Sequence, residues 1–285
     1  MAKSITVQEF FTQFPDDDSC LAHLFKQRYG DDPACGRCGE VGKFRKLSRM
    51  PAYTCNCGHH IHPMVGTPFG RTRVPLQKWF YAMYLFTTSR HGVPAKELQR
   101  QLGVSYETAW EMARKIRKYL GKVDGDGPLS GHVEVDETYI GGRRSGGKRG
   151  RGASGKTIVM GMVQRQGDVL TRVIANVQRA TLEAHILENV RKGSTVSTDE
   201  FNSYAKLSRH GYDHGLVHHS SDEWVNGVHH TNSVEGFWSL VKRSIRGAHV
   251  HVSRKHLATY LGEFEFRWNS RHAPEMMFPR LLLSF

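Results

Sequence analysis

The sequence predicts a multidomain protein, in which a small cysteine-rich ribbon and a helical region precede an α/β domain with a mixed five-stranded sheet. Two close pairs of cysteines within residues 35–62 predict the ribbon, and apolar residues at helical spacing over 75–120 predict the helices. After a turn-rich segment at 123–131, β-branched runs alternate with helical patterns. We therefore expect three domains, at residues 1–70, 71–122 and 130–285.

Composition narrows the functional class. The 285 residues are 39% hydrophobic, enough to bury a core, and carry a formal net charge of +13. That excess of Lys and Arg predicts a polyanionic partner, with phosphates the first candidate. The sequence has neither the pattern of a signal peptide nor an apolar run of membrane-spanning length. We expect a cytoplasmic, nucleoid-associated protein that faces nucleic acid and contacts no membrane.

The first 34 residues predict a short helical lead-in, and the cysteine pairs follow it. Two residues separate Cys35 from Cys38 and one separates Cys55 from Cys57, with glycines nearby that allow tight turns. Thiolates at such spacing predict a zinc ribbon, in which structural Zn²⁺ replaces part of a hydrophobic core. The short second pair leaves the fourth ligand open, and the candidates are Cys57, His59, His60 and His62.

The helical region predicts a helix-turn-helix. Pro75 opens one helix, Gly103 ends a second, and Ser105 is a good N-cap for a third. A helix, a glycine turn and a basic helix match the motif that places a recognition helix in the major groove of DNA. An ordinary helical hairpin with a solvated face is the alternative. We expect the third helix to expose four basic residues toward DNA, Arg114, Lys115, Arg117 and Lys118.

The α/β region begins with three predicted strands, at 132–140, 157–166 and 169–177, the last two joined by a tight turn. A helix, a strand, a helix, a strand and two final helices follow. Hairpin-joined strands pair antiparallel and later strands join through helical crossovers, so this order predicts a ribonuclease-H-like domain. The later elements are expected at 181–190, 193–201, 201–211, 214–220, 231–247 and 254–270.

Three acidic residues are the candidate catalytic and metal-binding groups. Asp136 and Asp199 lie where apolar, β-branched runs end, and Glu235 lies inside a helical pattern 36 residues after Asp199. Carboxylates from distant parts of a basic chain predict a shared site for Mg²⁺ or Mn²⁺, hard cations that also recruit substrate phosphates. Two such ions would suit cleavage or joining of a nucleic-acid backbone by in-line phosphoryl displacement.

The helix that contains Glu235 is also a candidate DNA contact. Lys242 follows Glu235 by seven residues and Asn232 precedes it by three, so the three share a helix face. Apolar anchors alternate with the basic residues Arg243 and Arg246, so one side of the helix can be buried while another contacts DNA. The alternative is a surface ion pair of Glu235 with Lys242 within the helix.

A glycine-rich loop at 141–156 follows the first predicted strand. It contains seven glycines and six Lys or Arg, with no acidic residue. Its position just after Asp136 favours an arm that follows the DNA backbone, and a mobile linker is the alternative. The DNA contacts expected here are Arg143, Arg144, Lys148, Arg149 and Arg151.

Most of the chain, from about Cys35 to Asn269, resembles a known family. The likeness is carried by VEVDETYIGG, STDEFNSY and HTNSVEGFWSLVKRSIRGAHVHVSRKHLATYLGEFEFRWN. These segments resemble bacterial insertion-sequence transposases with an N-terminal zinc ribbon and a DDE catalytic domain (the family numbered 1595). The resemblance implies a transposase that binds the inverted ends of its element in double-stranded DNA, cleaves there and joins them to target DNA. Synapsis of two ends favours a homodimer or larger assembly. By motif, Asp136, Asp199 and Glu235 would be the triad.

Several roles stay open from the sequence. Glu134 shares a strand face with Asp136 and Glu137 points to the other face, so either glutamate competes as the ligand. The other open residues are Glu200 beside Asp199, Asn232 as a third-motif residue, Tyr139 and Tyr204 as nucleophiles, and His219 near the catalytic centre. The functional alternatives are a domesticated DNA-binding protein that no longer cuts and a structure-specific nuclease.

Overall fold

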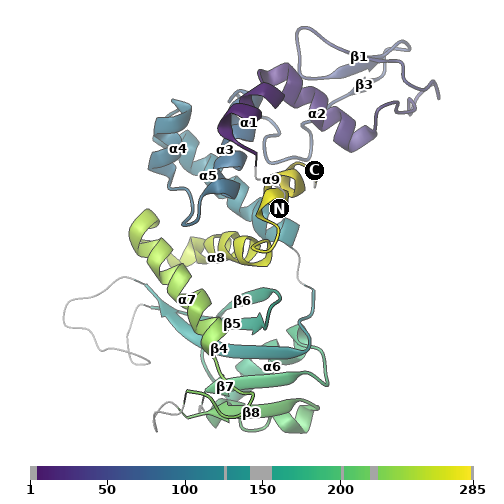
Figure 1. The fold of residues 1–285 in the computed structure, drawn as a ribbon. Helices are drawn as coiled ribbons and strands as arrows, with labels where there is room; N and C mark the ends of the chain where they lie inside the picture. Colours follow the sequence, from purple (N-terminus) through teal and green to yellow (C-terminus); the bar gives the residue numbers. More distant parts are fainter. Residues whose placement is uncertain (1–4, 125–126, 142–155, 200–201, 219–223, 284–285) are drawn as a thin grey trace. The chain divides into compact units, whose positions relative to one another are not determined.

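The computed structural model describes residues 5–124, 127–141, 156–199, 202–218 and 224–283 (Figure 1). The chain divides into two compact units. The N-terminal unit comprises Met1–Ser89, Ala95–Tyr119 and Ala273–Phe285, and the α/β unit comprises Arg90–Pro94 and Leu120–His272. This division differs from the expected domain bounds at the C-terminus, because residues 273–285 group with the N-terminal helices.

Two capped helices and a three-stranded ribbon begin the N-terminal unit. Helix α1 (Val7–Gln13) starts with a capping box of Thr6 and Glu9, and helix α2 (Asp17–Tyr29) with one of Asp16 and Ser19. The ribbon strands β1 (Phe44–Lys46), β2 (Tyr53–Cys55) and β3 (His60–Ile61) pair antiparallel in the order β1-β2-β3. Phe25 of α2 stacks on Tyr53 with ring centroids 4.0 Å apart, so this helix packs on the ribbon.

The remaining helices of the N-terminal unit surround an aromatic core. They are α3 (Leu76–Thr88), α4 (Ala95–Leu102), the first part of α5 (Tyr106–Asp124), and α9 (Met277–Leu283). Phe10 of α1 and Phe278 of α9 have ring centroids 5.8 Å apart, and Phe14 stacks on Phe80 at 5.0 Å. These ring contacts explain why the C-terminal helix belongs to this unit.

The helix boundaries of the predicted helix-turn-helix agree with the sequence. Pro75 precedes α3, and Gly103 follows α4 with a φ of 60°. The Ser105 hydroxyl caps α5 by accepting a hydrogen bond of 3.2 Å from the amide of Thr108. Among the helices that the structure describes, none has both the length and the apolar character needed to span a bilayer.

The α/β unit is built on a mixed five-stranded sheet. Its strands are β4 (His132–Ile140), β5 (Thr157–Gln164), β6 (Val169–Ile174), β7 (Thr195–Asp199) and β8 (Asp213–Val217). Their order is β6-β5-β4-β7-β8, in which β4 and β6 run antiparallel to β5, and β7 runs parallel to both β4 and β8. This order and these directions are those of the ribonuclease-H-like fold that the sequence predicts.

One predicted helix is wrong. The segment 201–211 contains two short 3-10 helices, η2 (Asn202–Tyr204) and η3 (Leu207–His210), in place of one α-helix. Tyr204 is the last residue of η2 and Leu207 is the first residue of η3, and both side chains are fully buried. Gly211, with a φ of 87°, then turns the chain toward β8. Burial of these two side chains in a short connection therefore outweighs the helical propensity of the segment.

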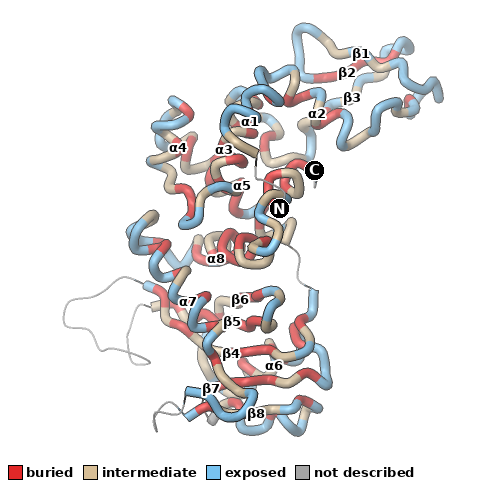
Figure 2. Tube along the Cα trace, in the orientation of Figure 1, coloured by how far each residue is buried: buried red, intermediate tan, exposed pale blue. Residues whose placement is uncertain are grey.

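Helices cover both faces of the sheet, and the buried parts of the strands lie between them (Figure 2). On one face, α6 (Arg179–Asn189) shares a core with Val135 of β4. On the other, α7 (Asn232–Ser244), a π-helical turn (Ile245–His249) and α8 (Arg254–Asn269) share a core with Ile140. Since side chains alternate along a strand, the even-numbered residues of β4 face α7.

Candidate active site

The four cysteines of the ribbon form a compact group of metal-ligating side chains. Among the described residues, no other group of three or more His, Cys, Asp or Glu converges as closely: the four sulfurs lie within 4.8 Å of one another. Cys35 Sγ lies 3.6 Å from Cys57 Sγ, and Cys38 Sγ lies 3.6 Å from Cys55 Sγ. Tetrahedral Zn²⁺ with Zn–S bonds of ~2.3 Å places its sulfurs about 3.8 Å apart, so the group fits structural zinc. Cys57 completes the ligand set without a histidine.

Asp136 and Asp199 extend from neighbouring strands on the same face of the sheet. The parallel register of β4 and β7 pairs Glu134 with Ser197, and each aspartate lies two residues further along its strand. A side chain returns to the same face after two residues. Asp199 is the last residue of β7, where it pairs with Val217 of β8. The two carboxylates are therefore neighbours on the α7 side of the sheet.

Helix α7 carries Glu235 across this face. Gly161 of β5 pairs with Asp136, and a Cβ on Gly161 would lie 2.4 Å from Cζ2 of Trp238, so α7 contacts the sheet directly beside Asp136. Glu235 precedes Trp238 by about one helical turn. The hydroxyl of Thr231, the N-cap residue, donates a hydrogen bond of 2.8 Å to Glu235 Oε1. That bond orients the Glu235 carboxylate.

The charges of the other acidic residues act on the ionisation of Asp136. Burial, followed by the negative charges of Glu137, Asp199 and Glu235, raises the pKa of Asp136 to about 7. A carboxyl group whose ionisation is opposed by several neighbouring carboxylates is stabilised strongly by a bound cation, which takes the place of its proton. Hard oxygen ligands of this kind fit Mg²⁺ or Mn²⁺.

Lys242 lies within electrostatic reach of Asp136. Burial lowers the pKa of its ammonium group, while the charge of Asp136 acts in the opposite direction. Asn232 is exposed at the first position of α7, Arg243 is exposed near its other end, and Arg246 is exposed in the π-helical turn that follows. The helix face predicted to contact DNA is therefore accessible in the α/β unit.

Two glutamates of β4 that compete with Asp136 in the sequence have other partners. Glu134 is fully buried, and both of its carboxylate oxygens accept hydrogen bonds from backbone or side-chain donors. Glu137 accepts a hydrogen bond from the hydroxyl of Tyr204. Tyr204 is fully buried, and burial together with the charge of Glu137 raises its pKa well above the usual value. The Tyr204 hydroxyl is therefore buried, protonated and engaged as a hydrogen-bond donor, and these properties do not suit a nucleophile.

Helix α5 exposes fewer basic residues than expected. Arg117 is only 2% exposed, and its guanidinium carbon lies 5.2 Å from the centre of the Phe86 ring. The prediction that this helix exposes Arg117 is wrong, because the long side chain packs within the helical core. Arg114 donates to Glu111 through Nε at 2.7 Å and through Nη2 at 2.6 Å. Lys115 is partly buried and Lys118 is exposed.

Several predicted residues cannot be compared with the structure. The loop residues Arg143, Arg144, Lys148, Arg149 and Arg151 lie outside the described residues. Glu200 and His219 also lie outside them. Their contacts with DNA or metal stay predictions.

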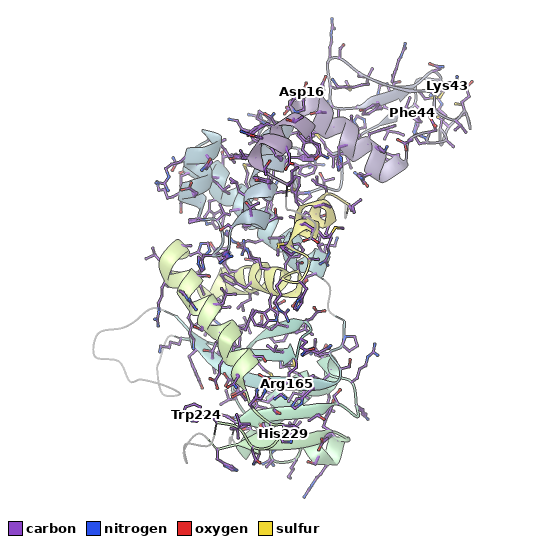
Figure 3. The ribbon with its side chains drawn as sticks, viewed as in Figure 1. Asp16, Lys43, Phe44, Arg165, Trp224 and His229 are labelled. Atoms are coloured by element: carbon purple, nitrogen blue, oxygen red, sulfur yellow. The ribbon has the colours of Figure 1, made fainter. Side chains whose placement is uncertain are left out.

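A polar network on the α7 side of the sheet was not foreseen from the sequence. Arg165, which follows β5, donates from Nε to Glu134 Oε1 at 2.8 Å. His132 Nε2 lies 2.7 Å from Ser197 Oγ, which lies 2.9 Å from Nδ1 of His229 (Arg165 and His229 are labelled in Figure 3). Burial, and then the charge of Arg165, lowers the pKa of His132 to about 4, so its imidazole is neutral. The one available signal was the alternation that puts His132 and Glu134 on the face of Asp136.

The sheet has the ribonuclease-H-like order, with acidic residues on the neighbouring strands β4 and β7 and on the helix that crosses them. Comparison with known families shows to which of them the chain belongs. Residues 128–269 match the ISXO2-like transposase domain, and residues 15–60 match the transposase zinc-ribbon domain. The chain belongs to this family of insertion-sequence transposases.

The names of two sequence relatives agree with the family. The chain is 29% identical over 258 residues to an uncharacterized protein in transposable element ISH50 of Halobacterium salinarum, an alignment that spans 82% of this chain and 84% of the relative. It is 34% identical over 102 residues to an uncharacterized transposase-like protein of Haemophilus influenzae, spanning 36% of this chain and 81% of the relative. A solved pre-cleavage Mos1 transpososome is 12% identical, with a TM-score of 0.31 over 72% of this chain and 78% of that one.

Proposed function

We propose that the chain is a DDE transposase that binds the ends of its element, cleaves the DNA and transfers the freed strand to target DNA. One observation carries the proposal. The parallel register of β4 and β7 makes Asp136 and Asp199 neighbours on the sheet face that α7 crosses with Glu235, and burial together with the charges of Glu137, Asp199 and Glu235 raises the pKa of Asp136 to about 7. Divalent cations compensate such a concentration of negative charge, and they are the usual partners of phosphoryl transfer.

Asp136, Asp199 and Glu235 are the residues that would hold Mg²⁺ or Mn²⁺, in the two-ion arrangement common to nucleases and polymerases. When bound, such ions lower the pKa of a water or a 3′-hydroxyl and stabilise the departing oxygen. The chain supplies the positions of the groups. The Thr231 hydroxyl holds the Glu235 carboxylate, and the ammonium group of Lys242, close to Asp136, is placed to bind a DNA phosphate.

Double-stranded DNA is the partner in this proposal. The net charge of +13 provides attraction to phosphates, and exposed Lys118, Arg243 and Arg246 are contact candidates on the described surface. Residues 71–122 would read the element ends beside the structural zinc ribbon, and 130–285 would carry the chemistry. Joining two ends in one reaction requires at least two copies of the chain on the DNA.

The test uses the full-length protein, Mg²⁺ or Mn²⁺, and linear DNA that carries the sequences on either side of the reading frame. Asp136→Asn, Asp199→Asn and Glu235→Gln should each lower the cleavage rate by ~10³-fold or more, since a metal ligand supplies several kcal/mol of transition-state stabilisation. DNA affinity should stay unchanged. Glu188→Gln makes the same charge change on a side chain that is 73% exposed, and it should cleave at the wild-type rate.

Two results would overturn the proposal in different ways. A wild-type chain that binds these ends but cleaves the DNA neither with Mg²⁺ nor with Mn²⁺ would be a domesticated DNA-binding protein. A chain that cuts unrelated DNA equally well and joins no strand would be a nuclease. Cleavage that survives in Asp136→Asn would remove the triad from the mechanism.

A further inference from the structure

Glu134 is a buried charge that caps a helix belonging to another part of the chain. It is fully buried in β4, and its Oε2 accepts hydrogen bonds from the backbone amides of Ser233 at 2.7 Å and Val234 at 3.1 Å. These are the second and third residues of α7, and the local N-cap residue Thr231 makes no side-chain cap bond to them. Amides at a helix N-terminus require an acceptor, and a carboxylate there is also favoured by the helix dipole.

The other carboxylate oxygen of Glu134, Oε1, also lies close to polar groups of the protein. Oε1 accepts from Ser233 Oγ at 3.0 Å and from Arg165 Nε at 2.8 Å, and His230 Nδ1 lies 3.1 Å away. Both oxygens are therefore used within the protein, and neither is left to bind a cation. A buried carboxylate bound on all sides is a structural anchor, although the sequence leaves it a competing metal ligand.

Arg165 connects this anchor to the chain that leads into α7. Its Nη1 donates to the carbonyl oxygen of Val228 at 2.7 Å, and its Nη2 donates to that of His230 at 3.2 Å. One guanidinium thus binds Glu134 in β4 and the carbonyls of Val228 and His230 in the loop before α7. The planar fork of five N–H donors makes such a three-way contact possible, which a lysine cannot reproduce.

A second chain of hydrogen bonds fixes the same loop to β7. Arg165 Nη1 lies 3.1 Å from His132 Nδ1, and an arginine only donates, so His132 carries its proton on Nε2. Nε2 then donates to Ser197 Oγ at 2.7 Å, and the Ser197 hydroxyl donates to His229 Nδ1 at 2.9 Å. The loop at 228–230 is therefore held from β4, β5 and β7 together.

We propose that Glu134 and Arg165 are positioning residues that set the distance between Glu235 and Asp136. Glu134 holds the amides one and two residues before Glu235, and it lies two residues before Asp136 on the same strand face. One side chain thus fixes α7 to the strand that bears the first catalytic aspartate. This inference rests on the proposed transposase function, because it assigns Glu235 and Asp136 to one cation site.

The test measures Mn²⁺ binding to the full chain by electron paramagnetic resonance, together with kcat and KM for DNA cleavage. Glu134→Gln replaces one acceptor oxygen with an NH₂ group, which would face the N–H or O–H donors that now bind Glu134. The substitution therefore weakens the attachment of α7 to β4. We expect Mn²⁺ affinity to fall ~10–100-fold, as for other residues that orient metal ligands, and kcat to fall ~10²-fold with KM for DNA unchanged. Arg165→Met should act in the same direction, and combining it with Glu134→Gln should cost less than the sum of the two single losses, because the two side chains belong to one hydrogen-bond network.

A matched control separates positioning from stability. Ile186→Ala removes core volume on the opposite face of the sheet, so it should lower the denaturation midpoint while keeping Mn²⁺ affinity and kcat. If Glu134→Gln does not fold, Ser233→Ala removes one of its hydrogen bonds and should show a smaller loss of Mn²⁺ affinity.

Two outcomes tell the claims apart. If Glu134→Gln keeps wild-type Mn²⁺ affinity and kcat while Asp136→Asn is inactive, the positioning role alone is overturned. An Asp136→Asn variant that still binds Mn²⁺ and cleaves would overturn the proposed function instead.

Discussion

Substitution of Gly161 by alanine tests whether the contact of α7 with the sheet sets the active site. Gly161 pairs with Asp136, and a Cβ there would lie 2.4 Å from Cζ2 and 3.1 Å from Cε2 and Cη2 of Trp238. Carbon atoms in contact prefer about 3.5–4.0 Å, so the ring must retreat by roughly 1.1–1.6 Å. Trp238 is only 3% exposed within the core of this face, so α7 has to move with it.

The expected loss follows from that displacement. A shift of ~1 Å at a catalytic group costs on the order of 10²-fold in rate, and overpacking a core costs ~1–3 kcal/mol of unfolding free energy. Single-turnover cleavage of end DNA in Mg²⁺ measures the loss of rate, and urea denaturation measures the loss of unfolding free energy. Gly127→Ala, where the added Cβ meets no atom within 4 Å, is the control. Trp238→Leu in the Gly161→Ala background should recover part of the rate. Wild-type cleavage by Gly161→Ala would refute this account of how α7 positions Glu235.

Three further predictions concern the ribbon and the buried charges. Cys57→Ser should lower the zinc content measured by a chromogenic chelator and unfold the ribbon, while His59→Ala should keep one zinc per chain; the reverse result would reassign the fourth ligand. Burial raises the pKa of Glu265 from 4.5 to about 7, so the folded chain keeps a proton on this carboxyl group that the unfolded chain releases near pH 4.5. The unfolding free energy that this proton contributes is therefore fully present below pH 4.5 and is lost as the pH rises through about 7. Glu265→Gln should flatten this part of the urea-midpoint curve, and an unchanged slope would contradict the assignment. Arg267→Met should cost ~3–5 kcal/mol, because it removes one partner of a buried ion pair in which Arg267 Nη2 lies 2.6 Å from Glu263 Oε1; a loss below 1 kcal/mol in urea denaturation would contradict this role of the pair.

Sequence patterns formed by residues close together in the chain predicted most of the architecture. Alternation of apolar residues located β4 and β5, glycine and serine marked the ends of α4 and α5, and paired cysteines marked the ribbon. The strand order followed, because hairpins and crossovers leave few possible sheets. The segment 201–211 was misassigned because burial of Tyr204 and Leu207 depends on the sheet beneath them.

Local chemistry in the sequence thus determined the class of domain, the two cysteine pairs and the candidate acidic triad, since each depends on residue type and short spacing. The tertiary structure alone decided that Cys57 completes the zinc site, that Arg117 is buried, and that Glu134 caps α7 instead of binding metal. The reason is physical. Glu134 and its partner Ser233 are 99 residues apart, and the role of a buried carboxylate depends on which donors the fold brings to it.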